Sequence, residues 1–157
     1  MWTDPLMISI DDNVEPPKEI EIKSYFLSDI IESSSYCGWD QLGKNKMDIS
    51  INGSYPSKSL WMHPPCNGFG YATYTIDEDP IFSGGVAFTD SAQPKEPCLF
   101  SIYSNGKAIW EKRIDKKCDI QNFSLCVPAG KLQLRACCNR DNSWMHCVWI
   151  YPNIEPR

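Results

Sequence analysis

The segment SIYSNGKAIW, residues 101–110, contains the strongest turn signal in the chain. Its Asn105-Gly106 dipeptide lies between two short runs rich in β-branched and aromatic residues. A type I′ turn needs a positive φ at both central positions, and Asn followed by Gly adopts this conformation most readily. The segment therefore predicts a β-hairpin, and Asn52-Gly53 is a second candidate for such a turn.

Similar short runs continue on both sides of this hairpin, separated by Gly, Pro, Asn or Asp roughly every eight to twelve residues. Many alternate apolar and polar side chains as half-buried strands do; Leu132, Leu134 and Ala136, for example, share one face. No segment keeps helical apolar spacing over a dozen residues, so we expect at most a helical turn near residues 28–32. The pattern predicts an all-β, antiparallel β-sandwich. The expected strands are residues 20–26, 47–51, 60–63, 69–76, 85–89, 98–103, 107–114, 120–127, 131–137 and 145–151.

The chain of 157 residues is predicted to form a single domain. Residues 1–18 are acidic, contain Pro5, Pro16 and Pro17, and are expected to be an extended arm before a β-sandwich over residues 19–157. The first twenty residues show neither the basic nor the apolar region of a signal peptide. We expect an extracellular or cell-surface location if the sequence belongs to a longer secreted chain, and an intracellular one if it is complete.

Charge and hydropathy argue against a nucleic-acid partner and against a membrane-spanning segment. The chain has 15 basic and 20 acidic residues, a net charge of -5, and its Lys and Arg residues form no basic face for phosphate. We therefore expect no nucleic-acid partner. No window approaches the roughly 18 apolar residues of a membrane span, so none is expected.

Eight cysteines make the chain cysteine-rich and leave two interpretations open. They form disulfides if the protein folds in an oxidising compartment, and they serve as small core residues if it does not. Cys137, Cys138, His146 and Cys147 are zinc-type ligands, but adjacent side chains do not easily turn toward one ion.

Catalytic motifs are absent from the sequence, which contains only two histidines, His63 and His146. Neither a nucleophile elbow nor a zinc-protease motif, phosphate loop or dinucleotide fingerprint is present. We therefore expect a protein that is not an enzyme.

Two segments, residues 60–68 and 141–149, combine Trp with His, Asn, Asp or Pro. A sugar presents an apolar C–H face and a rim of hydroxyls, so its sites combine a flat aromatic ring with polar groups. Trp61 and Trp144 adjoin loops and are predicted to be surface platforms. Trp39, Trp110 and Trp149 stand in alternating runs and are predicted to be core residues.

Seven pieces of the sequence, in order, resemble the NPCBM domain, which is also classed as carbohydrate-binding module family 51. The piece at residues 60–65 is similar to the family's Gly-Leu-x-x-His-Ala/Pro, and that at 146–149 to His-Ala-Asp-Trp. The resemblance covers about residues 22–152. The pieces are YFLSD (25–29), GWDQLG (38–43), ING (51–53), LWMHPP (60–65), FSIYSNG (100–106) with Trp110, LQL (132–134) and HCVW (146–149).

This resemblance implies a jelly-roll-like β-sandwich that binds galactose-type glycans through loops at one end. His63 and His146 fall on the family's histidine positions. Met145 and Val148 replace two acidic residues that many relatives carry, which removes groups able to hold sugar hydroxyls or an ion. Some relatives contain a structural calcium, so the resemblance allows one here, although no cofactor is required.

The sequence thus predicts a non-catalytic, lectin-like module. The alternative is a protein–protein scaffold or assembly subunit that uses the same sandwich without binding sugar. The predicted ligand-binding residues are His63, His146, Trp144, Trp61, and the polar loop Asn139, Arg140, Asp141 and Asn142.

Overall fold

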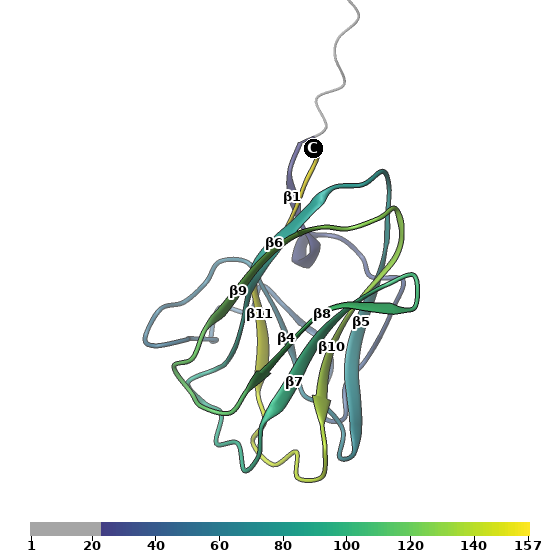
Figure 1. Ribbon diagram of the computed structural model, residues 1–157. Helices are drawn as coiled ribbons and strands as arrows, with labels where there is room; N and C mark the ends of the chain where they lie inside the picture. The colour runs from purple at the N-terminus through teal and green to yellow at the C-terminus, as the bar shows by residue number, and fades with distance from the viewer. Residues whose placement is uncertain (1–22) are drawn as a thin grey trace, which may run out of the picture.

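A computed structural model describes residues 23–157 as two antiparallel β-sheets packed face to face (Figure 1). The first sheet has the order β3-β4-β11-β6-β9, with β1 also pairing with β11, and the second has the order β2-β5-β10-β7-β8. The chain is therefore all-β, a jelly-roll-like sandwich, as predicted. The strands are β1 (Tyr25–Phe26), β2 (Ser34–Tyr36), β3 (Gly43–Lys44), β4 (Ser59–Met62), β5 (Gly68–Ile76), β6 (Ile81–Phe88), β7 (Cys98–Ser104), β8 (Lys107–Ile114), β9 (Gln121–Cys126), β10 (Gly130–Cys138) and β11 (Cys147–Glu155).

The core lies between the two sheets and is rich in aromatic side chains. Trp149 of β11 is fully buried, and its ring packs edge to face against Phe100 of β7 at 5.7 Å and Phe123 of β9 at 5.9 Å. In β10, Leu132, Leu134 and Ala136 point into this core as the alternation predicted. Period-two burial therefore fixes which face of each central strand turns inward.

The hairpin predicted at Asn105-Gly106 is confirmed. Asn105 has φ 49° and Gly106 φ 84°, and the turn joins β7 to β8. The Asn105 side chain also accepts a hydrogen bond from the Lys131 N–H at 2.8 Å, which ties the turn to β10. Asn52-Gly53 forms the second predicted turn, with φ 53° and 79°.

β8 is an edge strand of the second sheet and pairs only with β7 among the described strands. Most of its side chains are exposed, including those of Lys107, Glu111, Lys112 and Arg113. The mixed charges at residues 111–113 therefore lie on a solvated edge.

Four strand predictions need correction. The strand predicted at 85–89 is only the end of β6, which begins at Ile81, because Gly84 and Gly85 pair within the sheet instead of interrupting it. Residues 47–51 form no strand: Met47 is 91% exposed, and only Ile51 makes an isolated bridge, to Ser54. For the strand predicted at 20–26, the structure describes residues 23–26, and only Tyr25–Phe26 (β1) are in a strand. The strand predicted at 145–151 begins at Cys147 and continues to Glu155, because a β-bulge between Ile150 and Asn153 accommodates Pro152.

Two short strands, β2 and β3, were not predicted. Their sequences, Ser-Ser-Tyr and Gly-Lys, lack the apolar alternation on which the prediction rested. The helical turn expected near residues 28–32 occurs as a 3₁₀ turn at Leu27–Asp29. No helix within residues 23–157 has the length and apolar character to cross a membrane. The arm predicted at residues 1–18 lies outside the described residues.

Two tryptophan predictions were wrong. Trp39, expected in the core, is 61% exposed because it lies in a loop outside any strand. Trp61, expected at the surface, is only 6% exposed because Ile49 and Ile51 cover the outer face of β4. Trp149 is buried and Trp144 is 54% exposed, as predicted. Trp110 is half-buried against the core.

All eight cysteines lie within residues 23–157, and each is a free thiol. Cys98, Cys138 and Cys147 are buried, which agrees with the interpretation of cysteine as a small core residue.

Replacement of Trp149 by Ala should lower the free energy of unfolding by about 3–5 kcal/mol, because a large, fully buried side chain leaves a cavity. Urea denaturation followed by circular dichroism measures this loss. Trp39→Ala is the matched control, and its exposed ring predicts a loss well under about 1 kcal/mol. Similar losses for the two variants would contradict the placement of the core.

Candidate functional site

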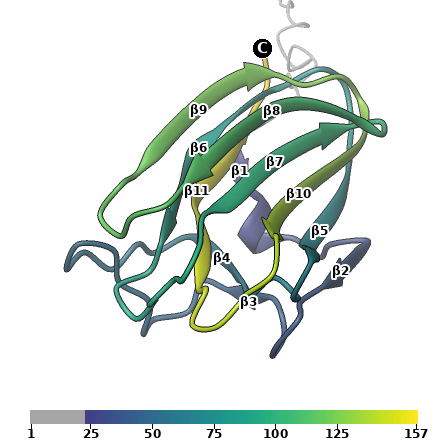
Figure 2. The same cartoon turned by 60° about the horizontal axis from the view of Figure 1, so that its bottom comes forward.

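A cavity of about 310 Å³ opens among the loops at one end of the sandwich, and we call it the Trp/His cavity. One wall belongs to the loop between β10 and β11, which comes forward at the bottom of Figure 2. This end lies opposite the C terminus (Figure 1). The cavity is lined by Gly38, Trp39, His63, Asn142, Ser143, Trp144 and His146.

His63 follows β4 and is fixed by a hydrogen bond to the chain itself. Its Nδ1 lies 3.0 Å from the Pro64 carbonyl oxygen. A carbonyl can only accept, so Nδ1 carries the hydrogen. Burial lowers the pKa of His63 and favours the neutral ring. The Nε2 of this neutral ring is therefore a hydrogen-bond acceptor.

His146 precedes β11 and is oriented by hydrogen bonds that run through two hydroxyl groups. Its Nδ1 lies 2.8 Å from the Ser91 hydroxyl, which lies 2.8 Å from the Thr89 hydroxyl. Thr89 also donates its backbone N–H to the His146 carbonyl at 3.0 Å. Burial, with a smaller contribution from nearby His63, lowers the pKa of His146. Both histidines are thus favoured in the neutral form at pH 7.

The two imidazole rings lie together, with 5.7 Å between their centroids. The buried ring of Trp61 packs against both, at 6.2 Å from His63 and 5.6 Å from His146. Trp61 therefore supports the histidines, and it is not among the residues that line the cavity.

Two exposed tryptophans flank the histidine pair. The ring of Trp39 lies 5.8 Å from that of His63, and the ring of Trp144 lies 5.7 Å from that of His146. The segment before Trp39 packs closely on the loop after β4, because Gly38 donates its N–H to the His63 carbonyl at 2.7 Å. A Cβ at Gly38 would overlap the backbone of Pro65, so this approach requires glycine.

Asn142 lines the cavity, but its amide is already paired. Its Nδ2 donates to the Pro64 carbonyl at 2.9 Å, and its Oδ1 accepts from the Cys66 thiol at 2.9 Å. The side chain therefore joins the β10–β11 loop to the loop after β4. Asn142 therefore shapes the cavity, with one of its two N–H groups and one lone pair of Oδ1 already engaged.

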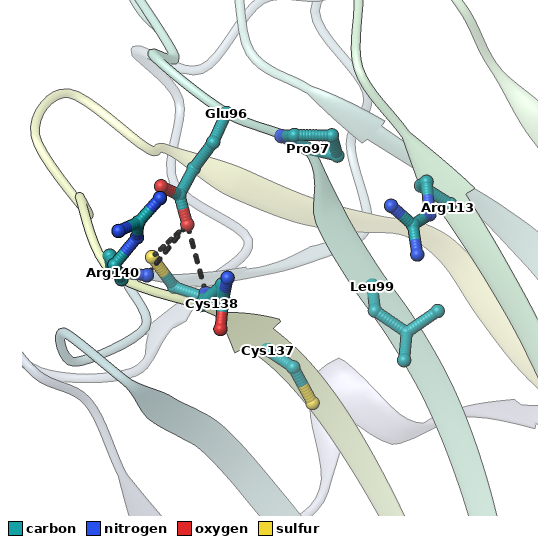
Figure 3. Close-up of a pocket in the computed structure, with 8 residues that line it drawn as sticks. Glu96, Pro97, Leu99, Arg113, Cys137, Cys138 and Arg140 are labelled. Carbon is teal, nitrogen blue, oxygen red and sulfur yellow. Dashed lines mark hydrogen bonds between the residues drawn. The ribbon is translucent and has the colours of Figure 1, made fainter.

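The other predicted loop residues, Asn139, Arg140 and Asp141, do not line the Trp/His cavity. Their backbone N–H groups donate to the Glu96 carboxylate at 2.9, 2.7 and 3.0 Å. Figure 3 shows this carboxylate directed at the backbone after Cys138. These hydrogen bonds lower the pKa of Glu96, so the carboxylate holding the loop is ionised.

Asn139 and Arg140 instead border a second cavity, of about 450 Å³ (Figure 3). It lies beside β7, β8 and β10, and its lining includes Leu99, Arg113 and Cys137. The polar loop predicted as one contact surface is therefore split: Asn142 lines the Trp/His cavity, Asn139 and Arg140 line the second cavity, and Asp141 lines neither.

The structure adds several residues that the sequence did not indicate. Trp39 was predicted in the core, although its position between Gly38 and Asp40 is typical of a loop. Ser91 and Glu96 act on partners more than forty residues away in the sequence, at His146 and at the β10–β11 loop. Nothing in a local pattern reports such long-range hydrogen bonds.

Within residues 23–157, no three His, Cys, Asp or Glu side chains gather as metal ligands, and this includes the cysteines near His146. Met145 and Val148, which the sequence resemblance placed at two acidic positions of the family, are fully buried. These two positions therefore supply no carboxylate that could bind a calcium ion.

No protein-family model matches the sequence, and no significant match is found among curated proteins. The fold and the cavity together define a β-sandwich with an aromatic site in its end loops. Solved structures of this architecture include CBM51 modules, so the predicted resemblance is confirmed at the level of the fold.

Three structures from Clostridium perfringens illustrate the likeness. The CBM51 of GH95 in complex with methyl-galactose has a TM-score of 0.71 and 13% identity, with 84% of this chain and 99% of that one covered. CBM51-2 of ZmpB in complex with GlcNAc has a TM-score of 0.74 and 16% identity over 85% of this chain. The structure of the ZmpB M60 catalytic domain with its two CBM51 domains has a TM-score of 0.71 and 17% identity, also over 85% of this chain. The chain spans only 32% and 15% of these two ZmpB structures.

Stability should fall as the pH is lowered from about 7.5 to about 5.5. The pKa values of His63 and His146 are lowered from 6.5 in the folded protein, so the unfolded chain binds protons more readily in this range. Their contribution is complete above about pH 6.5 and is lost as the pH falls below it. Urea denaturation at the two pH values measures the effect. The double variant His63→Gln/His146→Gln should lose most of it, and an unchanged wild-type midpoint would refute the assignment.

Glu96→Gln should loosen the β10–β11 loop, because the amide keeps one neutral acceptor where the carboxylate bound three N–H groups. We expect hydrogen exchange at the amides of residues 139–141 to accelerate by about tenfold. Mass spectrometry or NMR measures these rates. Glu155→Gln, at the opposite end of β11, is the control. Equal exchange in both variants would show that Glu96 does not hold the loop.

Proposed function

We propose that this protein is a non-catalytic carbohydrate-binding module that holds a sugar in the Trp/His cavity. One observation carries the proposal: two exposed tryptophans flank a pair of neutral histidines in an open cavity at the loop end of the sandwich. The fold shared with CBM51 modules supports it. Flat rings and fixed polar edges together match the two faces of a sugar.

The histidines suit hydroxyl recognition. The acceptor Nε2 of His63 can take a hydrogen bond from a sugar hydroxyl. The Nδ1 of His146 is engaged by Ser91, so its other nitrogen is the one left for a ligand. When Ser91 donates to Nδ1, the His146 Nε2 carries the hydrogen and donates. A hydroxyl, which both donates and accepts, satisfies such a pair, and this favours a neutral sugar over a charged group.

We propose a galactose-type terminal sugar as the ligand. A cavity of about 310 Å³ is at the small end of ligand sites, as expected for a terminal residue rather than a long chain. Galactose presents a continuous C–H patch on one face, which stacks on an indole ring. GlcNAc is the comparison sugar, because CBM51-2 of ZmpB was solved with it.

The lining of the cavity argues for binding without hydrolysis. Within the described residues it contains no Asp or Glu, whereas glycoside hydrolysis generally uses a pair of them. Single-site binding of this kind is weak, and attachment to other domains or repeated copies would raise its effective strength.

Titration of the full chain with methyl-galactoside, followed by NMR or calorimetry, tests the proposal. We expect saturable binding with perturbations at Trp39, His63 and His146. Trp144→Ala should weaken it by about tenfold or more through loss of stacking, and Trp144→Phe should retain part of it. Tyr55→Ala, which removes a 65% exposed ring that does not line the cavity, is the matched control.

Absence of binding to both methyl-galactoside and GlcNAc at tens of millimolar, with the protein folded, would overturn the proposal. Equal affinity of the wild type and Trp144→Ala for methyl-galactoside would show that the sugar does not bind in the Trp/His cavity. Binding of GlcNAc without binding of methyl-galactoside would support a carbohydrate-binding module but contradict a galactose-type ligand.

A further inference from the structure

Cys98 and Cys147 meet in the core where the two sheets face each other. Cys98 is the first residue of β7, in the second sheet, and Cys147 is the first residue of β11, in the first sheet. Both side chains are fully buried. The Cys147 thiol donates to the Cys98 sulfur at 3.5 Å. The two sulfur atoms are therefore in van der Waals contact across the sandwich.

This contact distinguishes the pair from the other six cysteines. Among the hydrogen bonds of residues 23–157, it is the one in which both the donor and the acceptor are sulfur atoms. Cys137 and Cys138 are adjacent in β10, so their side chains point to opposite faces of the sheet. The Cys138 thiol is directed instead at Glu96. Cys66, Cys118 and Cys126 are exposed.

We infer that Cys98 and Cys147 are a site of disulfide formation that links the two sheets when the chain folds in the presence of a small-molecule disulfide. The two thiols lose two protons and two electrons and form one S–S bond. Glutathione disulfide is the oxidant: it takes up both electrons and both protons and leaves as two glutathione thiols. The inference does not depend on sugar binding.

The bond forms during folding rather than in the finished core. Complete burial shields both sulfur atoms from a soluble oxidant, and burial raises the pKa of the Cys98 thiol, which disfavours the reactive thiolate. As the sheets assemble, the pair comes together while it is still accessible. Disulfide geometry requires the sulfur atoms to approach to about 2.05 Å, a modest side-chain movement from contact.

The cross-link lies directly beneath the loops of the Trp/His cavity. Cys147 follows His146, and Cys98 lies two residues after Glu96, which holds the β10–β11 loop. The bond also closes a loop between residues 49 positions apart and so restricts the unfolded chain. We expect the oxidised protein to be more stable and its β10–β11 loop to be anchored at both ends.

The test is refolding of the reduced, denatured full chain in a mixture of reduced and oxidised glutathione, followed by alkylation and mass spectrometry. We expect a main species with two fewer hydrogen atoms and six alkylated cysteines, because two of the eight are paired. Proteolysis should release a peptide with Cys98 joined to Cys147. The thermal midpoint should rise by about 10 °C over the reduced protein.

Two sets of variants control the experiment. Cys98→Ala and Cys147→Ala should each lose the cross-linked species. The triple variant Cys66→Ser/Cys118→Ser/Cys126→Ser, which removes the exposed thiols, should retain it. If a core variant fails to fold, the peptide map of the wild type decides alone. Eight alkylated cysteines after refolding, or a peptide joining any other pair, would overturn the inference.

Discussion

The packing of Trp149 against Phe100 and Phe123 is the contact on which the rest of the structure depends. Phe123 shares a sheet with Trp149 and Phe100 belongs to the other, so this one cluster joins the two layers. Burial of these rings gives the strands their inward faces and leaves the strand ends free to carry loops. The loops at these strand ends are available for recognition.

The loops are nevertheless held in place, and the Pro64 carbonyl is the point where they meet. It accepts from His63 Nδ1 and from Asn142 Nδ2, so one oxygen orients an imidazole and anchors the β10–β11 loop. Glu96 fixes the start of the same loop. These polar contacts pre-form the cavity, and a ligand would not have to order it.

The sequence was sufficient where burial repeats with period two. β5, β7 and β10 were predicted to within a residue or so at either end, because each has one face in the core. It failed for Trp39 and Trp61, whose burial depends on what covers them. Ile49 and Ile51 lie in a segment predicted as a strand, yet they serve as a cover over Trp61. Similarly, the family positions led to His63 and His146, but their support by Ser91 and Pro64 arises only from the folded chain.

The charged edge formed by β8 affects how such a domain behaves near its own copies. Unpaired backbone groups along an edge strand invite a second sheet to extend the first. The charged side chains of β8 oppose such pairing, since it would desolvate them; these are Lys107, Glu111, Lys112 and Arg113. The sandwich can therefore be crowded on a surface, or repeated along one polypeptide, with little tendency to aggregate through this side.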